Sequence, residues 1–293
     1  MYELKQVSEN CYYINCPAKI GIYVPDKENA YLVDSGNDKA AGRKVRQILD
    51  QNGWHLNAIL NTHSHADHIG GNRYLQGQTG CKIYARGIEA AFTKDPVLEP
   101  SFLYGGYPCK DLRHKFLMAQ ESDVSDFADE DFPKEIEVIP LPGHSFDMAG
   151  FRMPDGVVFL ADCISSRETL EKYAVPFIYD VGAYLQTLDL VEGMEAAVFV
   201  PSHAEAAEDI NELVCYNRDQ VHGIAERILS ICEKPVNFEG ILQEVFRGYG
   251  FVMNFEQYVL VGSTVRSYLS WLKDNGKLDA MFEDSMLLWQ RKR

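Results

Sequence analysis

The residues of this chain best suited to chemistry are histidines and aspartates that stand where predicted strands end. The densest group lies at residues 63–68, where three histidines and one aspartate occur in a single short loop. Neutral imidazole and carboxylate are good ligands for a borderline divalent cation such as zinc. Four ligands in so short a loop exceed what one tetrahedral ion conveniently takes, so the pattern favours two neighbouring ions. These candidate ligands are His63, His65, Asp67 and His68.

Three further ligand-type residues, His144, Asp162 and His203, each follow a predicted strand. Open α/β sheets place their ligands at the carboxyl ends of strands. A single histidine or aspartate at such a place is more often a turn or a cap, and the repetition of the placement is what marks these three. Of the eight histidines in the chain, three lie in the 63–68 loop, which argues against chance. We therefore expect all seven residues to meet at one centre.

The pattern of apolar residues places these side chains on an α/β framework. Segments 30–33, 58–60 and 157–160 are short apolar runs that predict strands, whereas residues 37–52 have helical spacing and are followed by Gly53. Strands and helices alternate in this way as far as about residue 210. Such alternation predicts a layered α/β fold rather than separate all-α and all-β parts.

The remaining organisation is a mainly helical C-terminal region and one irregular insertion. We place a domain boundary near residue 210, dividing the chain into 1–210 and 211–293, with one short strand expected at 258–261. An insertion at about 89–134 contains several prolines and glycines. Long irregular segments are often lids or binding loops, so we expect three aromatic residues of the insertion to contact substrate, unless they only cover the surface of the fold. These are Phe102, Tyr104 and Tyr107.

Composition argues against several classes of protein. The formal net charge of −15 opposes binding to nucleic-acid backbones and to anionic membranes. Seven scattered cysteines without a CxxC pattern do not suggest a disulfide framework or a Cys-type zinc site. The sequence shows no export signal and no apolar run of about 18 residues. It therefore predicts a cytoplasmic protein that does not enter a membrane.

In its ligand residues the sequence resembles the metallo-β-lactamase-fold superfamily, over about residues 1–210. Asp34-Ser35-Gly36 matches an early strand-end aspartate of that superfamily. The resemblance implies an αββα sandwich with a dinuclear metal centre at one edge. The matching positions, in order, are Thr62-His63-x-His65-x-Asp67-His68, Gly143-His144, Asp162 and His203.

The resemblance also implies a role for each ligand. Asp162 would bridge two ions, and Asp34 would orient the ligand loop without binding metal itself. Zinc fits this set best, with iron and manganese as alternatives, because mixed histidine and aspartate centres accept several first-row metals. The implied ligand sets are His63, His65 and His144 for one ion, and Asp67, His68 and His203 for the other.

His68 follows Asp67, and an aspartate stands at the bridging position. This ligand pattern resembles that of the glyoxalase II, lactonase and ribonuclease branches of the superfamily. The implied chemistry is hydrolysis, in which two divalent ions lower the pKa of a bridging water and the resulting hydroxide attacks a carbonyl or phosphoryl centre. Asp67 is then the catalytic residue that orients the hydroxide. Cys163 is expected to be a core residue, because its side chain should point away from the metals if that of Asp162 points at them.

Residues 211–293 carry a weaker resemblance, to a winged-helix module, through two helices followed by Gly276-Lys277. The second of these helices offers few basic residues, chiefly Arg266 and Lys273, to a DNA groove. We therefore favour a packing, homodimer or substrate-pocket role over binding of duplex DNA. Glyoxalase II proper has a different helical C-terminal domain that binds glutathione, and this departure argues against a glutathione thioester as the substrate.

Three functional hypotheses remain open at this stage. The first is a hydrolase of a small-molecule thioester, ester or lactone. The second is a phosphodiesterase or an endoribonuclease of single-stranded RNA, which the acidic charge opposes and the two metals favour. The third is a non-catalytic metal-binding regulatory module, against which the complete set of ligands argues.

Overall fold

The computed structural model describes residues 2–292, and its N-terminal part contains a six-stranded sheet. Neighbouring strands pair antiparallel from β1 to β4 and parallel from β4 to β6. The parallel part brings the ends of β4 and β5 to the same edge of the sheet. The strands, in spatial as in chain order, are β1 (Glu3–Gln6), β2 (Cys11–Asn15), β3 (Ile20–Tyr23), β4 (Asn29–Val33), β5 (His55–Leu60) and β6 (Lys82–Tyr84).

Helices make the crossovers between these parallel strands. The predicted helix at 37–52 is α1, which begins after Asp38, whose side chain accepts hydrogen bonds from two backbone N–H groups, and ends before Gly53 in the left-handed conformation. Its buried Val45 and Leu49 lie one helical turn apart and pack against the outer face of the sheet. The crossover helices are α1 (Lys39–Asn52), α2 (Ala66–Ile69) and α3 (Asn72–Thr79).

A second sheet of four strands has the order β10-β9-β8-β7. Strands β9 and β10 are parallel, so their carboxyl ends also meet at one edge, while the other pairs are antiparallel. Helices α6 (Arg167–Tyr173) and α7 (Val181–Glu192) connect β9 to β10. The strands are β7 (Glu137–Pro140), β8 (Ala149–Arg152), β9 (Val157–Ser165) and β10 (Val198–His203).

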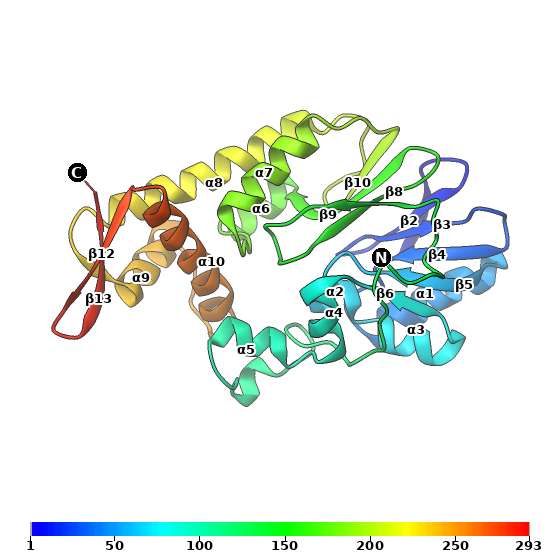
Figure 1. The fold of residues 1–293 in the computed structure, drawn as a ribbon, viewed down its shortest axis with the longest axis horizontal. Helices are drawn as coiled ribbons and strands as arrows, with labels where there is room; N and C mark the ends of the chain where they lie inside the picture. The colour runs from blue at the N-terminus through cyan, green and yellow to red at the C-terminus, as the bar shows by residue number, and fades with distance from the viewer. Residues whose placement is uncertain (1, 293) are drawn as a thin grey trace.

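The two sheets pack face to face with helices on both outer sides (Figure 1), which confirms the αββα sandwich predicted from the sequence. Tyr13 and Val33 of the first sheet share a core with Phe151 and Phe159 of the second. A Cβ atom on Gly21 would lie 2.5 Å from the Phe159 ring, so the sheets approach here as closely as only glycine permits.

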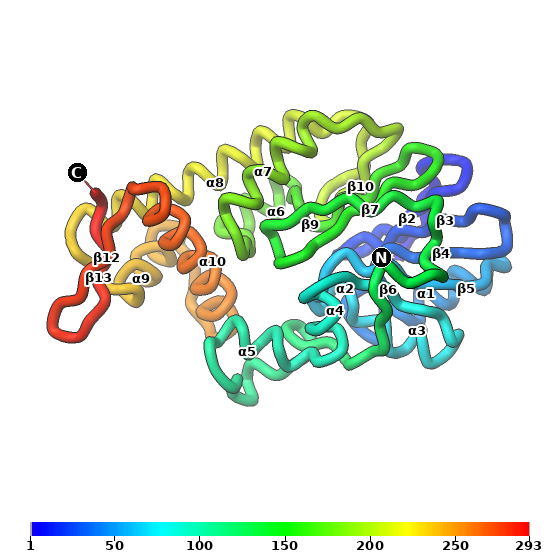
Figure 2. The backbone as a smooth tube through the Cα atoms, in the orientation of Figure 1, coloured from blue at the N-terminus to red at the C-terminus, as the bar shows by residue number. Residues whose placement is uncertain are grey.

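The insertion predicted at about 89–134 contains α4 (Gly87–Lys94), α5 (Leu98–Tyr104) and a 3-10 helix, η1 (Lys110–Leu112). Its apolar side chains, among them Leu103 and Leu112, form a small core with Val259 from the C-terminal region. Figure 2 shows α5 beside the start of helix α10, which lies more than 150 residues later in the chain. The insertion therefore links the sandwich to the C-terminal helices.

After β10 the chain is mainly helical, as predicted, and it ends in a β-hairpin (Figure 1). The predicted strand at 258–261 is wrong, because these residues lie within a helix that Asn254 caps through the backbone N–H of Gln257. The elements are α8 (Asn211–Ile231), β11 (Val236–Asn237), α9 (Phe238–Tyr249), α10 (Phe255–Asp274), β12 (Leu278–Glu283) and β13 (Met286–Arg291), and the three strands form a sheet of order β11-β13-β12.

These helices share one hydrophobic core with the second sheet. Buried Leu160 of β9 and Leu188 of α7 belong to the same cluster as Val221 of α8 and Tyr268 of α10. The domain boundary near residue 210 and the winged-helix character of residues 211–293 stay predictions. None of the helices within residues 2–292 combines the length and apolar character that crossing a bilayer requires.

Candidate metal centre

The loop that follows β5 carries four of the predicted ligands into the edge of the sandwich. Its backbone is fixed on both sides, because Ala149 N donates to Thr62 O at 2.9 Å and Ser35 N donates to His68 O at 2.8 Å. His63 and His68 are fully buried. The loop is therefore held between the two sheets rather than exposed as an ordinary polar turn.

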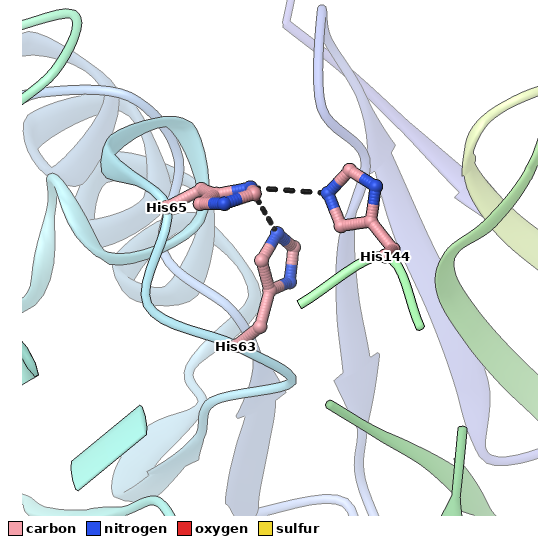
Figure 3. Close-up of side chains that lie close together, drawn as sticks. All are labelled: His63, His65 and His144. Atoms are coloured by element: carbon pink, nitrogen blue, oxygen red, sulfur yellow. Dashed lines mark hydrogen bonds between the residues drawn. The ribbon is translucent and has the colours of Figure 1, made fainter. Parts of the chain in front are cut away.

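Three histidines of this centre converge on one point (Figure 3). His65 Nδ1 lies 3.0 Å from His63 Nε2 and 3.0 Å from His144 Nε2. His144 comes from the connection between β7 and β8, 79 residues away from His65. The structure thus brings together the first predicted ligand set, which we call the three-histidine cluster.

The other predicted ligands gather around the carboxylate of Asp162, near the end of β9. Its Oδ2 lies 3.1 Å from His203 Nε2 and 3.6 Å from His144 Nε2, and its Oδ1 lies 3.3 Å from His68 Nε2. Asp67 Oδ2 lies 3.5 Å from His203 Nε2. The group of Asp67, His68, His203 and Asp162 is called the carboxylate cluster below. Asp162 contacts members of both clusters, and its role as the bridging ligand stays a prediction.

Hydrogen bonds outside the clusters fix the orientation of three histidine rings, so that Nε2 of each ring points toward the centre. Thr62 Oγ1 donates to Asp34 at 2.8 Å, so its contact of 2.9 Å with His63 Nδ1 is one in which the histidine donates. His68 Nδ1 donates to Asp34 Oδ2 at 2.7 Å, and His203 Nδ1 donates to Pro17 O at 2.9 Å. Because Nδ1 is the donor in each of these contacts, Nε2 is the ring nitrogen left to face the centre, where a metal ion would displace any proton that it carries.

Two buried atoms at the centre, His68 Nε2 and Asp162 Oδ1, lie 3.3 Å apart, yet neither makes a hydrogen bond with any described residue. Buried polar atoms are rarely left without a partner. Here they are an imidazole nitrogen and a carboxylate oxygen, which are the atoms that bind divalent cations. Three groups of ligand atoms, each within 4.8 Å of one another, include all seven predicted ligands. The residues present therefore fit metal ions.

Burial and charge shift the histidine pKa values in opposite directions in the two clusters. Burial lowers the pKa of His65 to about 4 and that of His144 to about 3, so the three-histidine cluster is neutral at physiological pH. In the carboxylate cluster, burial also lowers the histidine pKa values, but Asp162 outweighs this and raises the pKa of His203 to about 10. That half of the centre thus attracts positive charge, which a divalent cation would satisfy.

Comparison with known proteins agrees with this geometry. The family model described as "Metallo-beta-lactamase superfamily" matches residues 6–203, which is most of the chain and contains all seven residues. The chain belongs to the metallo-beta-lactamase superfamily.

Two solved structures share the fold of nearly the whole chain. A metallo-beta-lactamase family protein from Thermus thermophilus superposes with a TM-score of 0.75 at 16% identity and covers 98% of this chain and 100% of its own. A beta-lactamase domain protein from Burkholderia ambifaria has a TM-score of 0.71 at 18% identity, with 99% and 94% covered. At these identities the likeness establishes the fold alone.

Curated relatives match smaller parts of the chain. A hydroxyacylglutathione hydrolase from Maricaulis maris (strain MCS10) is 30% identical over 148 residues, which cover 49% of this chain and 46% of the relative. A "Beta-lactamase-like protein 2 homolog" from Drosophila melanogaster is 24% identical over 180 residues, covering 61% and 56%. The chain spans about half the length of these two relatives.

Asp34 contacts Thr62 and His68, the residues at the two ends of the ligand loop. It has a φ of 65°, a left-handed conformation that aspartate and asparagine tolerate better than most residues. Besides its contacts with the Thr62 hydroxyl and His68, it accepts a hydrogen bond of 2.8 Å from Thr62 N. One carboxylate therefore fixes both the ligand loop and the His68 ring.

We expect Asp34→Asn to weaken zinc affinity by about 10- to 100-fold, the usual effect of losing a hydrogen-bond partner of a ligand histidine. Asparagine keeps the size and the backbone conformation. Its NH2 group would, however, face at least one of the three donors, which are Thr62 N, Thr62 Oγ1 and His68 Nδ1, and that hydrogen bond would be lost. Titration with zinc against a chelator measures the effect. Asp26→Asn is the matched control, because Asp26 accepts similar backbone hydrogen bonds in an exposed turn. Equal affinity in the two variants would contradict this role.

Cys163 is fully buried in the core that the second sheet shares with α7 and α8, and its thiol belongs to none of the candidate ligand groups in residues 2–292. Adjacent residues of a strand point to opposite faces. The side chain of Asp162 reaches the centre, so that of Cys163 packs among apolar residues, and burial raises the pKa of its thiol.

Cys163→Ala is accordingly expected to leave the number of bound metal ions unchanged. It should lower the free energy of unfolding by about 1 kcal/mol, a typical cost of a small loss of core volume. Metal analysis together with urea unfolding checks both parts. Loss of one ion would show that the thiol is a ligand.

Sequence reasoning missed two glutamates beside the centre. Glu99, in the first turn of α5, places Oε1 3.6 Å from His65 Nε2, the ring nitrogen that faces away from the three-histidine cluster. Burial, and then the nearby Glu89 and Asp67 carboxylates, raise the pKa of Glu99 to about 8. Glu89 of α4 is also buried. In the sequence both look like ordinary acidic residues in the first turn of a helix, and only the packing of the insertion reveals them.

Proposed function

We propose that this chain is a dinuclear metal-dependent hydrolase, with zinc as the favoured metal, that acts on a small-molecule thioester, ester or lactone. The observation that carries the proposal is the sharing of Asp162 between the three-histidine cluster and the carboxylate cluster. Membership of the superfamily and similarity to hydroxyacylglutathione hydrolases support it. In this proposal His63, His65 and His144 hold one ion, and Asp67, His68 and His203 hold the other.

Divalent ions bound there would supply Lewis acidity and a water of lowered pKa. The protein residues provide the rest. Asp34 and Pro17 O keep the histidines in the tautomers that expose Nε2. The side chain of Asp67 is 44% exposed, against 8% for Asp162, so of the two carboxylates Asp67 is the one that reaches the solvent side of the centre. We assign Asp67 as the catalytic residue that accepts a hydrogen bond from the attacking water and orients it.

The substrate side of the proposal rests on a cavity of about 680 Å³ between α5 and α10. Phe102 and Tyr104 of the insertion line it, facing Arg266 and Trp271 of α10. The lining contains none of the seven predicted ligands, but Tyr179 in its wall donates its backbone N–H to His144 O at 3.2 Å, so the cavity lies beside the segment that carries His144. Its wall combines aromatic rings with polar side chains such as Ser267 and Asp274, and a concave site that offers both kinds of group suits a small polar molecule.

The third aromatic residue proposed for substrate contact, Tyr107, lies differently. Its ring is 73% exposed, and its hydroxyl accepts a hydrogen bond of 2.8 Å from Arg113. It does not line the cavity. Its contact with substrate stays a prediction that separate replacement can decide.

Tyr104→Ala should raise KM by about tenfold and change kcat by less than about twofold. An aromatic contact remote from the reacting bond contributes equally to binding of the ground state and the transition state, and about 1.4 kcal/mol corresponds to a tenfold change. Steady-state kinetics of this variant beside Tyr107→Ala tests the cavity. A fall in kcat at constant KM would place Tyr104 at the chemical step instead.

A side-by-side assay decides between the functional candidates. Chromogenic thioesters, esters, lactones, bis-p-nitrophenyl phosphate and labelled single-stranded RNA are offered to the zinc-loaded protein. His65→Ala is the inactive variant, and His222→Ala, an exposed position on α8, is the matched control. We expect turnover of a carbonyl substrate that is lost in His65→Ala and kept in His222→Ala.

The same assay holds the outcomes that would overturn the proposal. Turnover of RNA or the phosphodiester alone, lost in His65→Ala, would favour the nuclease. The aromatic residues that line the cavity could also stack against the bases of an RNA substrate. Bound metal without turnover of any substrate would favour a regulatory module. Turnover that survives in His65→Ala comes from a contaminant.

A further inference from the structure

Glu89 is a buried carboxylate that accepts four hydrogen bonds at the back of the metal centre. It lies in the first turn of α4 and is 1% exposed. Its Oε2 accepts from Ser64 N at 2.9 Å and from Ser64 Oγ at 2.6 Å. Its Oε1 accepts from Ser145 Oγ at 2.7 Å and from Asp147 N at 3.0 Å. A buried charge satisfied in this way is strongly held in place.

The donors come from the two segments that supply the three-histidine cluster. Ser64 stands between His63 and His65 in the loop after β5, and Ser145 directly follows His144 in the loop after β7. These loops belong to different sheets of the sandwich. The single carboxylate of Glu89 therefore joins the two halves of the cluster from outside it.

The helix that carries Glu89 is itself anchored to one of these loops. Ile88 N donates to Asp147 Oδ2 at 2.9 Å, which is the reverse of the bond from Asp147 N to Glu89. The same Asp147 carboxylate occupies the place where a Cβ on Gly87 would stand, and Gly87 has a φ of 53°. This mutual pair of bonds fixes the first turn of α4, and with it the position of the Glu89 carboxylate.

We infer that Glu89 is a positioning residue that sets the distance between the 63–65 loop and His144, and so holds the three histidines ready for one metal ion. This inference rests on the proposed function. It assigns to the insertion a task at the metal centre as well as at the cavity. Because a carboxylate only accepts hydrogen bonds, the amide of glutamine would turn its NH2 toward a pair of donors and leave them unpaired.

The experiment measures metal binding in the full chain for Glu89→Gln and Ser145→Ala. Zinc affinity comes from competition with a chelator, and the absorption spectrum of bound Co²⁺ reports the coordination of the metal. Glu89→Gln should weaken affinity by about 10- to 100-fold and change the Co²⁺ spectrum. Ser145→Ala should have a smaller effect of the same kind. The zinc affinity of the double variant should fall by less than the product of the two single fold-changes, since both substitutions act through one contact.

The matched control is Asp155→Asn. Asp155 also accepts hydrogen bonds from a serine hydroxyl and a second residue, Ser8 and Cys11, but it precedes the start of β9 and so lies at the opposite end of that strand from Asp162. It should leave zinc affinity and the Co²⁺ spectrum unchanged. If Glu89 only stabilised the fold, Glu89→Gln and Asp155→Asn would both have a lower melting temperature, and the two variants would bind zinc with the same affinity.

The possible results separate this inference from the proposed function. Wild-type affinity and an unaltered Co²⁺ spectrum in Glu89→Gln would overturn the inference while the proposed function stands. A wild-type chain that binds no Co²⁺ would overturn the proposed function and the inference with it. Where Glu89→Gln fails to fold, Ser145→Ala decides, because it keeps the carboxylate, and unchanged binding in that variant overturns the inference.

Discussion

Asp162→Ala is expected to lower kcat/KM by more than about a hundredfold and to reduce bound metal from two ions per chain to one or fewer. Loss of an outer hydrogen-bond partner of a ligand already costs 10- to 100-fold in metal affinity or activity, and in the proposed function Asp162 is a ligand shared by both ions. Its carboxylate lies within 3.6 Å of His144, His68 and His203. Alanine removes the one group that contacts both clusters, so metal content and turnover should fall together.

The measurement is metal analysis of the purified variant beside its steady-state kinetics. Asp50→Ala is the control, because Asp50 is an exposed aspartate on α1 whose ion pair with Arg46 contributes little to stability. A variant of Asp162 that keeps two ions and full activity would show that the bridging position is elsewhere. Full metal content with lost turnover would assign Asp162 to the chemistry rather than to metal binding.

Removal of the metals should destabilise the folded protein as well as abolish turnover. An ion present at a thousand times its dissociation constant stabilises the folded state by about 4 kcal/mol, and each kcal/mol shifts the melting temperature of a chain of this size class by about 2–4 °C. Chelation should therefore lower the melting temperature by on the order of 10 °C. The cause is local, since without metal ions the charges of Asp162 and Asp67 are opposed only by neighbouring histidines that must take up protons, such as His203.

Thermal unfolding with and without chelator, followed by return of zinc, measures this effect. His65→Ala is the useful comparison, because a chain that lacks one ligand should respond less to the chelator. Recovery of both melting temperature and turnover on return of zinc is the expected result. A melting temperature that chelator leaves unchanged would contradict a structural contribution of the metals.

The convergence of the seven predicted ligands could be expected from the sequence, because these residues are concentrated in one loop and at the ends of strands. The loop at 63–68 stands out by its composition. Asp162 and His203 lie near the ends of β9 and β10, and because these strands are parallel, their ends necessarily meet at one edge. The sequence order of the ligands thus carries spatial information once the strands are recognised.

The contacts of the insertion were not predictable in the same way. Glu89 and Glu99 lie in a segment with little regular pattern, and each resembles an acidic residue that favours the start of a helix. What distinguishes them is burial against residues of other elements, such as Ser145 and His65. Packing between distant segments decides such contacts, and no local spacing records it.

The strand wrongly predicted at 258–261 has a related cause. Its residues, rich in valine, favour strands locally. The helix prevails because Asn254 caps it and because buried residues at helical spacing, among them Val261, Val265 and Leu272, complete the core under the second sheet. Tertiary packing overrides local propensity here.

The core that the second sheet shares with the C-terminal helices bears on how the molecule loses its structure. Leu160 on β9 and Tyr268 on α10 are buried in one cluster, so neither can be exposed to solvent without disturbing the other. The strands that present Asp162 and His203 and the helix that walls the cavity belong to one cooperative unit. A molecule bound in the cavity would therefore stabilise the strands that carry Asp162 and His203 against unfolding, although it contacted none of their side chains.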